Sequence, residues 1–116
     1  MKQEIYIQGR GYNASATYND GKIIVHQGSQ LNYPEVNGFK INSTALTFRE
    51  NEEFVKDGVV IKECDFESPS TAAQFITGGS RNGYDTWKVE KGMSLGEFLE
   101  EHGIRTRRKN KNRKTN

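Results

Sequence analysis

The stretch Phe66–Lys88, FESPSTAAQFITGGSRNGYDTWK, combines the start and end signals of a helix with a turn and the only tryptophan of the chain. Ser68 is a preferred helix-capping residue, and Pro69 suits the first helical position because its N–H is not needed there. Gly78-Gly79 can end the helix by adopting a left-handed conformation. Helical spacing produces an apolar stripe of Pro69, Ala72, Ala73 and Ile76, widened by Phe75, and an opposite polar face of Ser70, Gln74 and Thr77. We therefore predict a helix that begins at Ser68 and packs on the core.

The residues after this helix predict a turn and then a strand. Asn and Gly tolerate positive φ, so Ser80-Arg81-Asn82-Gly83 is typical of a turn. The period-two pattern of Tyr84–Val89 predicts a strand that carries Trp87. The helix start, a cationic turn and an aromatic strand would then be neighbours.

Several short motifs carry a resemblance to a known family. They are Ser68-Pro69-Ser70-x-Ala72-Ala73, Gly78, Ser80-x-Asn82-Gly83, Trp87-Lys88 and Ser94-Leu95, with Gly28-Ser29 and with Arg49 ahead of Gly58-Val59-Val60. On these motifs the chain resembles the uncharacterised (DUF) domain often appended to the C-terminus of GIY-YIG endonucleases and of restriction-type proteins. That family has leucine and lysine before the Gly-Ser pair, where this chain has His26-Gln27. The chain is also similar to the RAMA (restriction enzyme adenine methylase associated) domain, which implies a module that reads DNA rather than cleaves it.

The N-terminal part of the chain predicts a short strand followed by a β-hairpin. Ile5 and Ile7 alternate with polar residues in the strand, and Gly9-Arg10-Gly11 turns the chain. Asp20-Gly21 is a signal for a two-residue hairpin loop. With the turn at this position, the core-facing pairs would be Tyr18 with Ile23 and Ala16 with Val25.

Two further helices and a strand complete the predicted fold. One helix would run from Ser43 or Thr44 to Asp57 and end at Gly58, and a strand over 59–61 would lead through Cys64 to the Ser68 helix. The last helix begins at Ser94, because Ser94 and Glu97 have the spacing of a capping box. The fold class is therefore α+β, a small antiparallel sheet with an N-terminal hairpin packed against about three helices. Residues 1–104 would form a single domain.

Charge is divided unevenly along the chain. Residues 105–116 contain seven of the seventeen basic residues and none of the fifteen acidic residues, so this tail carries +7 and residues 1–104 carry −5. The tail also has no apolar side chain, and we expect it to be disordered. No run approaches the roughly 18 apolar residues of a membrane span, and no signal peptide pattern is present. The sequence predicts a cytoplasmic protein that does not contact membranes.

Catalytic chemistry is not indicated by the sequence. A catalytic site would need a nucleophile with its base, paired carboxylates or a metal cluster, and two histidines far apart with a single cysteine supply none of these. Gly9–Ala14 matches the dinucleotide-binding pattern G-x-G-x-x-A, but that pattern requires a following helix, and a strand is predicted here. The GIY-YIG nuclease signature is absent as well. We expect no enzyme activity, no cofactor and no metal site.

Binding chemistry is better represented than catalysis. The free N–H groups at the start of the Ser68 helix favour an anion. Tyr84 and Trp87 offer flat rings for a nucleobase, although Trp87 also suits the core. The predicted nucleic-acid-binding residues are Ser68, Ser70, Thr71, Arg81, Asn82, Tyr84, Trp87 and Lys88 in the body, and Arg105, Arg107, Arg108, Lys109, Lys111, Arg113 and Lys114 in the tail.

Two functions stay open at this point. In the first, the chain is a non-catalytic accessory module that binds nucleic acid, DNA rather than RNA, in restriction, modification or phage defence, with a nuclease or another defence-system protein as a further partner. In the second, it is a protein–protein interaction module of a defence or counter-defence assembly without direct nucleic-acid contact.

Overall fold

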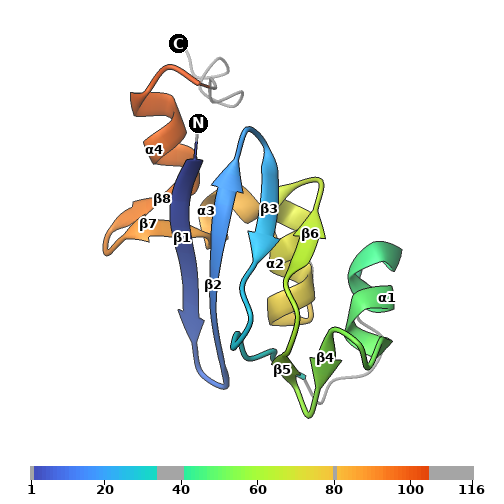
Figure 1. The fold of residues 1–116 in the computed structure, drawn as a ribbon. Coiled ribbons are helices and arrows are strands. Elements are labelled where there is room, and N and C mark those ends of the chain that lie inside the picture. Colours follow the sequence, from blue (N-terminus) through green and yellow to red (C-terminus); the bar gives the residue numbers. More distant parts are fainter. Residues whose placement is uncertain (1, 34–40, 80, 105–116) are drawn as a thin grey trace.

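The computed structural model describes residues 2–33, 41–79 and 81–104 and shows an α+β fold, as predicted (Figure 1). Its elements, in chain order, are β1 (Lys2–Gly9), β2 (Tyr12–Asn19), β3 (Lys22–Val25), α1 (Ser43–Glu50), β4 (Val55–Lys56), β5 (Val59–Val60), β6 (Cys64–Phe66), α2 (Pro69–Thr77), α3 (Gly83–Thr86), β7 (Lys88–Glu90), β8 (Met93–Ser94) and α4 (Leu95–Glu101).

The main sheet is antiparallel, and its strand order is β6-β3-β2-β1-β7-β8. The predicted hairpin is confirmed: Tyr18 pairs with Ile23 and Ala16 pairs with Val25. Its turn has positive φ at both central residues, 51° at Asp20 and 96° at Gly21, as hairpins that follow the right-handed twist of the strands require. A second, two-stranded sheet joins β4 to β5.

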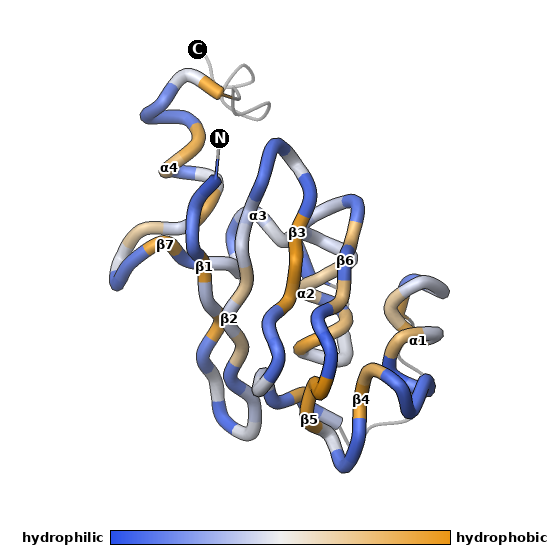
Figure 2. The backbone as a smooth tube through the Cα atoms, viewed as in Figure 1, coloured by the Kyte–Doolittle hydropathy of each residue, from blue (hydrophilic) through white to orange (hydrophobic). Residues whose placement is uncertain are grey.

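The hydrophobic core lies on one face of the main sheet. Alternate residues of β1, β2 and β3 are buried there, among them Ile5, Ala16 and Ile23, and α2 packs on β2, β3 and β6 behind the sheet in Figure 1. Hydropathy along the backbone marks β3 and β5 as strongly apolar (Figure 2). The opposite face is turned to the viewer in Figure 1, where no described helix lies over it.

The signals predicted for the helix ends are confirmed. The Ser68 hydroxyl accepts a hydrogen bond from the Thr71 N–H at the start of α2, and Gly78 follows Thr77 in the left-handed conformation. In α4 the Ser94 hydroxyl and the Glu97 carboxylate form both bonds of the capping box. Within the described ranges, no helix is both long and apolar enough to cross a bilayer.

The helix predicted over 43–57 is shorter than expected. It ends at Glu50, because Asn51 leaves the helical conformation and its side chain accepts the N–H of Glu53 at 2.9 Å. The chain then forms the hairpin of β4 and β5, with positive φ at Asp57 and Gly58. The Asp57-Gly58 dipeptide is therefore a hairpin turn and not a helix end.

The strand predicted over 84–89 is wrong in its first half. Gly83–Thr86 forms the short helix α3, because Asn82 caps it by accepting the Tyr84 N–H at 2.9 Å. The strand is limited to Lys88–Glu90. Thr77 also departs from its predicted polar face, since it is 2% exposed and donates its hydroxyl to the Ala73 carbonyl.

Candidate functional site

The fold brings the start of α2 close to the segment 82–87. The Gly83 N–H donates to the Ser70 hydroxyl at 2.9 Å, and the Trp87 indole N–H donates to the Pro69 carbonyl at 3.0 Å. The start of α2 and the segment 82–87, which the sequence predicted to be neighbours, are therefore joined by direct hydrogen bonds. Both hydrogen bonds connect protein groups to each other, so they first of all fix the position of α3 on α2.

Trp87 belongs to the core. Its side chain has 0% exposure and its indole N–H is already bonded, so neither face of the ring is open to a base. The ring of Tyr84 is half-buried and packs against the same core. The stacking surface considered for Trp87 therefore does not exist in this structure.

The start of α2 is largely enclosed by protein. Gly83 packs so closely on it that an added Cβ would lie 2.1 Å from the Pro69 carbonyl carbon and 2.3 Å from the Ser70 nitrogen. The Ser68 hydroxyl accepts the Thr71 N–H at 3.2 Å and donates to the Thr71 hydroxyl at 3.1 Å. Gly83 thus occupies space beside the first helical residues that an anion would need, and the anion site expected there is closed on that side.

Two cations of the predicted cluster lie near α3. Arg81 is exposed and makes no hydrogen bond or ion pair with another residue of the described ranges, and the half-buried Lys88 donates from Nζ to the Asp85 carbonyl at 3.0 Å. Asn82 is exposed, but its side-chain oxygen is used as the cap of α3. The seven basic residues predicted for the tail, which start at Arg105, lie outside the described residues.

Arg49 is a cation whose role the sequence did not reveal. Its guanidinium donates to the Phe75 carbonyl at 2.9 Å, to the Asn32 carbonyl at 2.5 Å and to the Ile76 carbonyl at 3.4 Å, and lies 4.6 Å from the centre of the Tyr33 ring. Burial lowers the pKa of Arg49, and the neighbouring Tyr33 opposes part of that shift. Arg49 therefore binds the carbonyl end of α2 and ties α1 to it.

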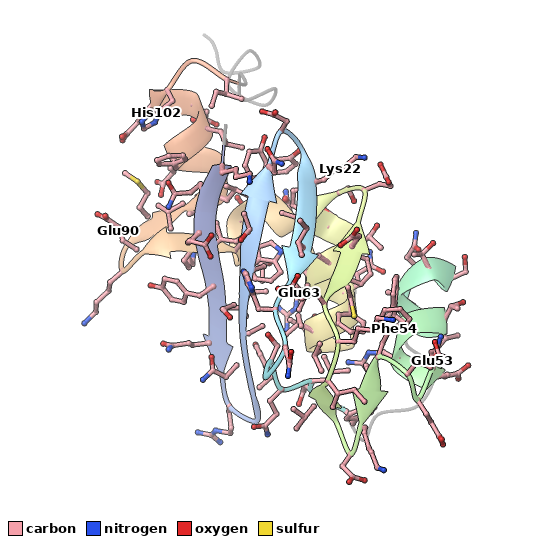
Figure 3. The ribbon with its side chains drawn as sticks, in the orientation of Figure 1. Lys22, Glu53, Phe54, Glu63, Glu90 and His102 are labelled. Carbon is pink, nitrogen blue, oxygen red and sulfur yellow. The ribbon has the colours of Figure 1, made fainter. Side chains whose placement is uncertain are left out.

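A polar network lies on the uncovered face of the sheet. His26 is flanked by two carboxylates, with Nε2 3.3 Å from Glu4 and Nδ1 3.3 Å from Glu63. The Thr17 hydroxyl lies 2.9 Å from Nε2 and donates to Glu4 at 2.7 Å. Thr17 and His26 share this face because alternate residues of β2 and β3 point to the core, whereas their two acidic partners come from segments far away in sequence. Figure 3 shows Glu63 beside the strands of this face.

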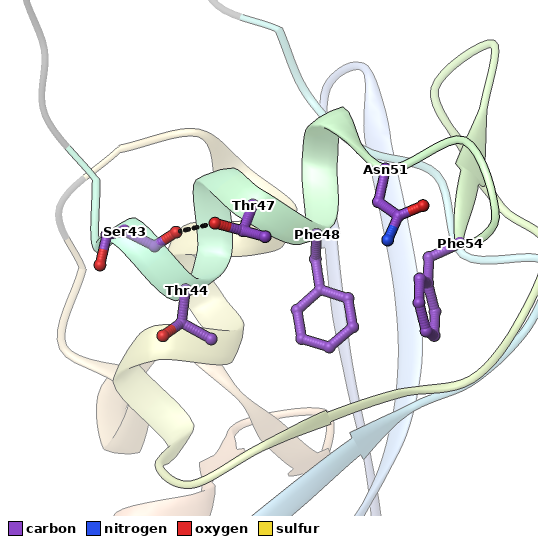
Figure 4. A pocket seen from close by; sticks show the side chains of 6 residues that line it. All are labelled: Ser43, Thr44, Thr47, Phe48, Asn51 and Phe54. Atoms are coloured by element: carbon purple, nitrogen blue, oxygen red, sulfur yellow. Dashed lines mark hydrogen bonds between the residues drawn. The ribbon is translucent and has the colours of Figure 1, made fainter.

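A pocket of about 340 Å³ lies between α1 and the segment that leads into β4 (Figure 4). The described residues that line it are Ser43, Thr44, Thr47, Phe48, Asn51 and Phe54. The sequence pattern did not predict this pocket, because it indicated one long helix over all of these residues. The Asn51 side chain that ends α1 also creates the concave surface, since it turns the chain so that Phe54 faces Phe48.

The single cysteine is inert. Burial, with a smaller contribution from the charge of Asp65, raises the pKa of the Cys64 thiol to about 12. Cys64 has 0% exposure in the core, so it is a packing residue and not a nucleophile at neutral pH. Among the described residues, no group of three or more His, Cys, Asp or Glu side chains is placed to hold a metal ion.

Comparison with known proteins gives one family and no individual relative. No curated protein and no solved structure matches the chain. The sequence model of a domain of unknown function, DUF4357, matches residues 5–99. That range begins within β1, contains the joint between α2 and α3, and ends in α4. The chain therefore belongs to the DUF4357 family.

Proposed function

We propose that this chain is a non-catalytic accessory module that binds nucleic acid, DNA rather than RNA, in a restriction, modification or phage-defence system. The observation that carries the proposal is the separation of charge, with +7 on residues 105–116 and −5 on residues 1–104. Seven cations without an acid attract phosphates irrespective of base sequence. The net negative charge of the body repels phosphates, except where the body carries exposed cations.

Two cations of the body support this proposal by their position. Arg81 and Lys88 flank α3, and α3 packs against α4, the last described helix before the basic tail. These two cations and the last described residues before the tail thus belong to the same part of the fold. An ordered arginine can discriminate between ligands by geometry, whereas attraction between basic residues and phosphates supplies affinity alone. The resemblance to domains of GIY-YIG and restriction-type proteins, and to RAMA domains, favours DNA as the ligand.

Fluorescence anisotropy with a labelled DNA duplex tests the proposal. If the tail makes about five phosphate contacts, the logarithm of the association constant should fall with the logarithm of the salt concentration with a slope of about −4.5. A variant with the seven tail cations replaced by glutamine should show a much shallower slope. No binding of the wild-type protein at low salt would refute the proposal, and equal slopes for both proteins would refute the role of the tail.

The second candidate, a protein–protein interaction module, is favoured by the uncovered face of the sheet. On this face His26 lies between the carboxylates of Glu4 and Glu63, and Asp65 lies on the neighbouring strand β6, where it pairs with Ile24. A basic protein partner would bind to this face. The double substitution Glu4→Gln with Glu63→Gln should lower the affinity for that partner. The same double substitution should leave DNA binding unchanged, so the two candidates can be separated.

A further inference from the structure

The pocket beside α1 has a rigid aromatic wall. The Phe48 ring packs against core rings, with centroid distances of 5.0 Å to Phe66 and 6.1 Å to Phe75. The Phe48 ring also meets Phe54, with a centroid distance of 4.9 Å and an angle of 87° between the rings, an edge-to-face contact. A flat ring laid on the face of Phe48 would therefore meet Phe54 at a right angle. Offset stacking and edge-to-face contact are the two arrangements that aromatic rings prefer.

The pocket also presents an oriented hydrogen-bond donor. The Asn51 side-chain oxygen accepts the Glu53 N–H at 2.9 Å, which fixes the amide and identifies its nitrogen. Figure 4 shows this nitrogen pointing toward the space between Phe48 and Phe54. The hydroxyls of Ser43 and Thr44 lie farther along the same wall. An aromatic ring with acceptor atoms on its edge suits this arrangement, whereas a plain hydrocarbon ring would leave the donor without a partner.

Size and charge restrict the ligand further. A volume of about 340 Å³ is at the lower end of the range for ligand pockets, roughly 300–1,000 Å³, and suits one base with its sugar. The first turn of α1 contains no acidic residue, while Glu50, Glu52 and Glu53 follow at the other end. A phosphate attached to the ligand would therefore meet least repulsion beside Ser43 and Thr44. Lys62, with Nζ 5.2 Å from the Phe54 ring centre, adds a cation near the aromatic pair.

We propose that this pocket holds a single unpaired nucleobase, stacked on Phe48, edge-on to Phe54 and hydrogen-bonded to the side-chain amide of Asn51. This inference rests on the proposed function and gives the body a way to select single-stranded or extruded bases. The basic tail would hold the backbone, and the pocket would admit one base at a time.

Nuclear magnetic resonance of the full-length, 15N-labelled protein tests the pocket with the four deoxynucleoside 5′-monophosphates as separate probes. The shifted signals should come from residues 43–54 and include the Asn51 side-chain amide. Asn51→Asp keeps the acceptor for the Glu53 N–H and removes the donor, so it should weaken binding by about tenfold. The matched control is Asn19→Asp at the end of β2, which makes the same chemical change away from α1 and should leave the affinity unchanged.

The outcomes separate this inference from the proposed function. If labelled DNA binds but no nucleotide shifts residues 43–54, the pocket assignment is wrong and the proposed function stands. If nucleotides bind the pocket while no oligonucleotide is bound, the ligand class is right and the nucleic-acid module is not. Unchanged affinity in Asn51→Asp overturns the assignment. So does binding of N-acetyltryptophanamide in place of nucleotides, which would identify the pocket as a site for a protein side chain.

Discussion

Among single residues of the described chain, Gly83 is the glycine at which an added Cβ would come closest to the backbone of another element. Its backbone lies against Pro69 and Ser70 so closely that a Cβ would come within 2.1 Å of backbone atoms. Backbone cannot move aside as a flexible side chain can, so the two helices would have to separate. The contact explains why an Asn-Gly dipeptide that is typical of a turn starts a helix here.

Gly83→Ala should destabilise the protein by about 1–3 kcal/mol, the usual cost of forcing an extra group into a packed region. Urea denaturation followed by circular dichroism measures this change in the free energy of unfolding. Gly79→Ala is the matched control, because nothing lies within 4 Å of the Cβ it would add. Equal midpoints for the two variants would mean that α3 does not pack on α2 as described.

Ionisation of Cys64 makes the free energy of unfolding depend on pH in the alkaline range. Its pKa is raised to about 12 in the folded protein, whereas an exposed thiol ionises near pH 8.5. The unfolded chain therefore releases a proton that the folded protein keeps. Because this release favours the unfolded chain, the free energy of unfolding declines as the pH rises above about 8.5 toward 12. Between pH 8 and pH 10 the wild type should lose about 2 kcal/mol more than Cys64→Ala, measured by urea denaturation at each pH. Parallel pH profiles would contradict the burial of the thiol.

Arg81 is the exposed cation that the fold does not require. Arg81→Ala should change the free energy of unfolding by no more than about 0.5 kcal/mol, as is usual for a surface substitution. We predict that it nevertheless reduces the preference among single-stranded, double-stranded and modified DNA, measured by competition anisotropy. Arg10→Ala, at an exposed turn between β1 and β2, controls for the loss of one charge. If the wild type discriminates and Arg81→Ala discriminates equally well, Arg81 lies outside the interface.

At the scale of elements, α2 is held at both of its ends by other helices. Its first residues bind α3 through Ser70 and Pro69, and its last carbonyls bind Arg49 of α1. Helix ends leave carbonyl groups without intrahelical partners, so a side chain that satisfies them stabilises the helix. The position of α1, and with it the pocket, depends on this arginine.

Arg49→Met should lower the free energy of unfolding by about 3 kcal/mol, because it removes charge-assisted hydrogen bonds to three carbonyls while retaining much of the side-chain length. Thermal and urea denaturation measure the loss. Arg10→Met is the exposed control and should be close to neutral. A neutral Arg49→Met would show that water replaces the guanidinium at no cost.

The sequence predicted those elements whose signals are local. The caps at Ser68 and Ser94 and the Asp20-Gly21 turn specify their structures within a few residues, and all three are confirmed. The sequence did not predict α3, because this helix depends on contact with α2. It did not predict the β4–β5 hairpin either, because the sequence pattern at Asp57-Gly58 indicated the end of a helix and not a turn. Trp87 could not be placed from spacing alone, because only the folded chain brings the Pro69 carbonyl to its indole.

At the scale of the whole molecule, the charge of the tail and the geometry of the body predict separate effects on binding. Replacing the tail cations by glutamine should weaken the binding of modified and of unmodified duplex DNA by the same factor, because phosphate attraction does not depend on the base. Anisotropy titrations at one salt concentration measure these factors. A loss confined to one kind of DNA would place selectivity in the tail and contradict the role assigned to the body.

The position of β1 in the sheet has a consequence for how the chain can be made. Although β1 comes before β2 in the chain, it lies between β2 and β7, and its second edge is paired where Tyr6 meets Lys88. During synthesis, the hairpins of β1, β2 and β3 can form early, but Tyr6 has no strand partner on this edge until Lys88 leaves the ribosome. A nascent chain halted before Lys88 would leave this part of β1 unpaired beside other nascent chains, and unpaired strand edges promote aggregation.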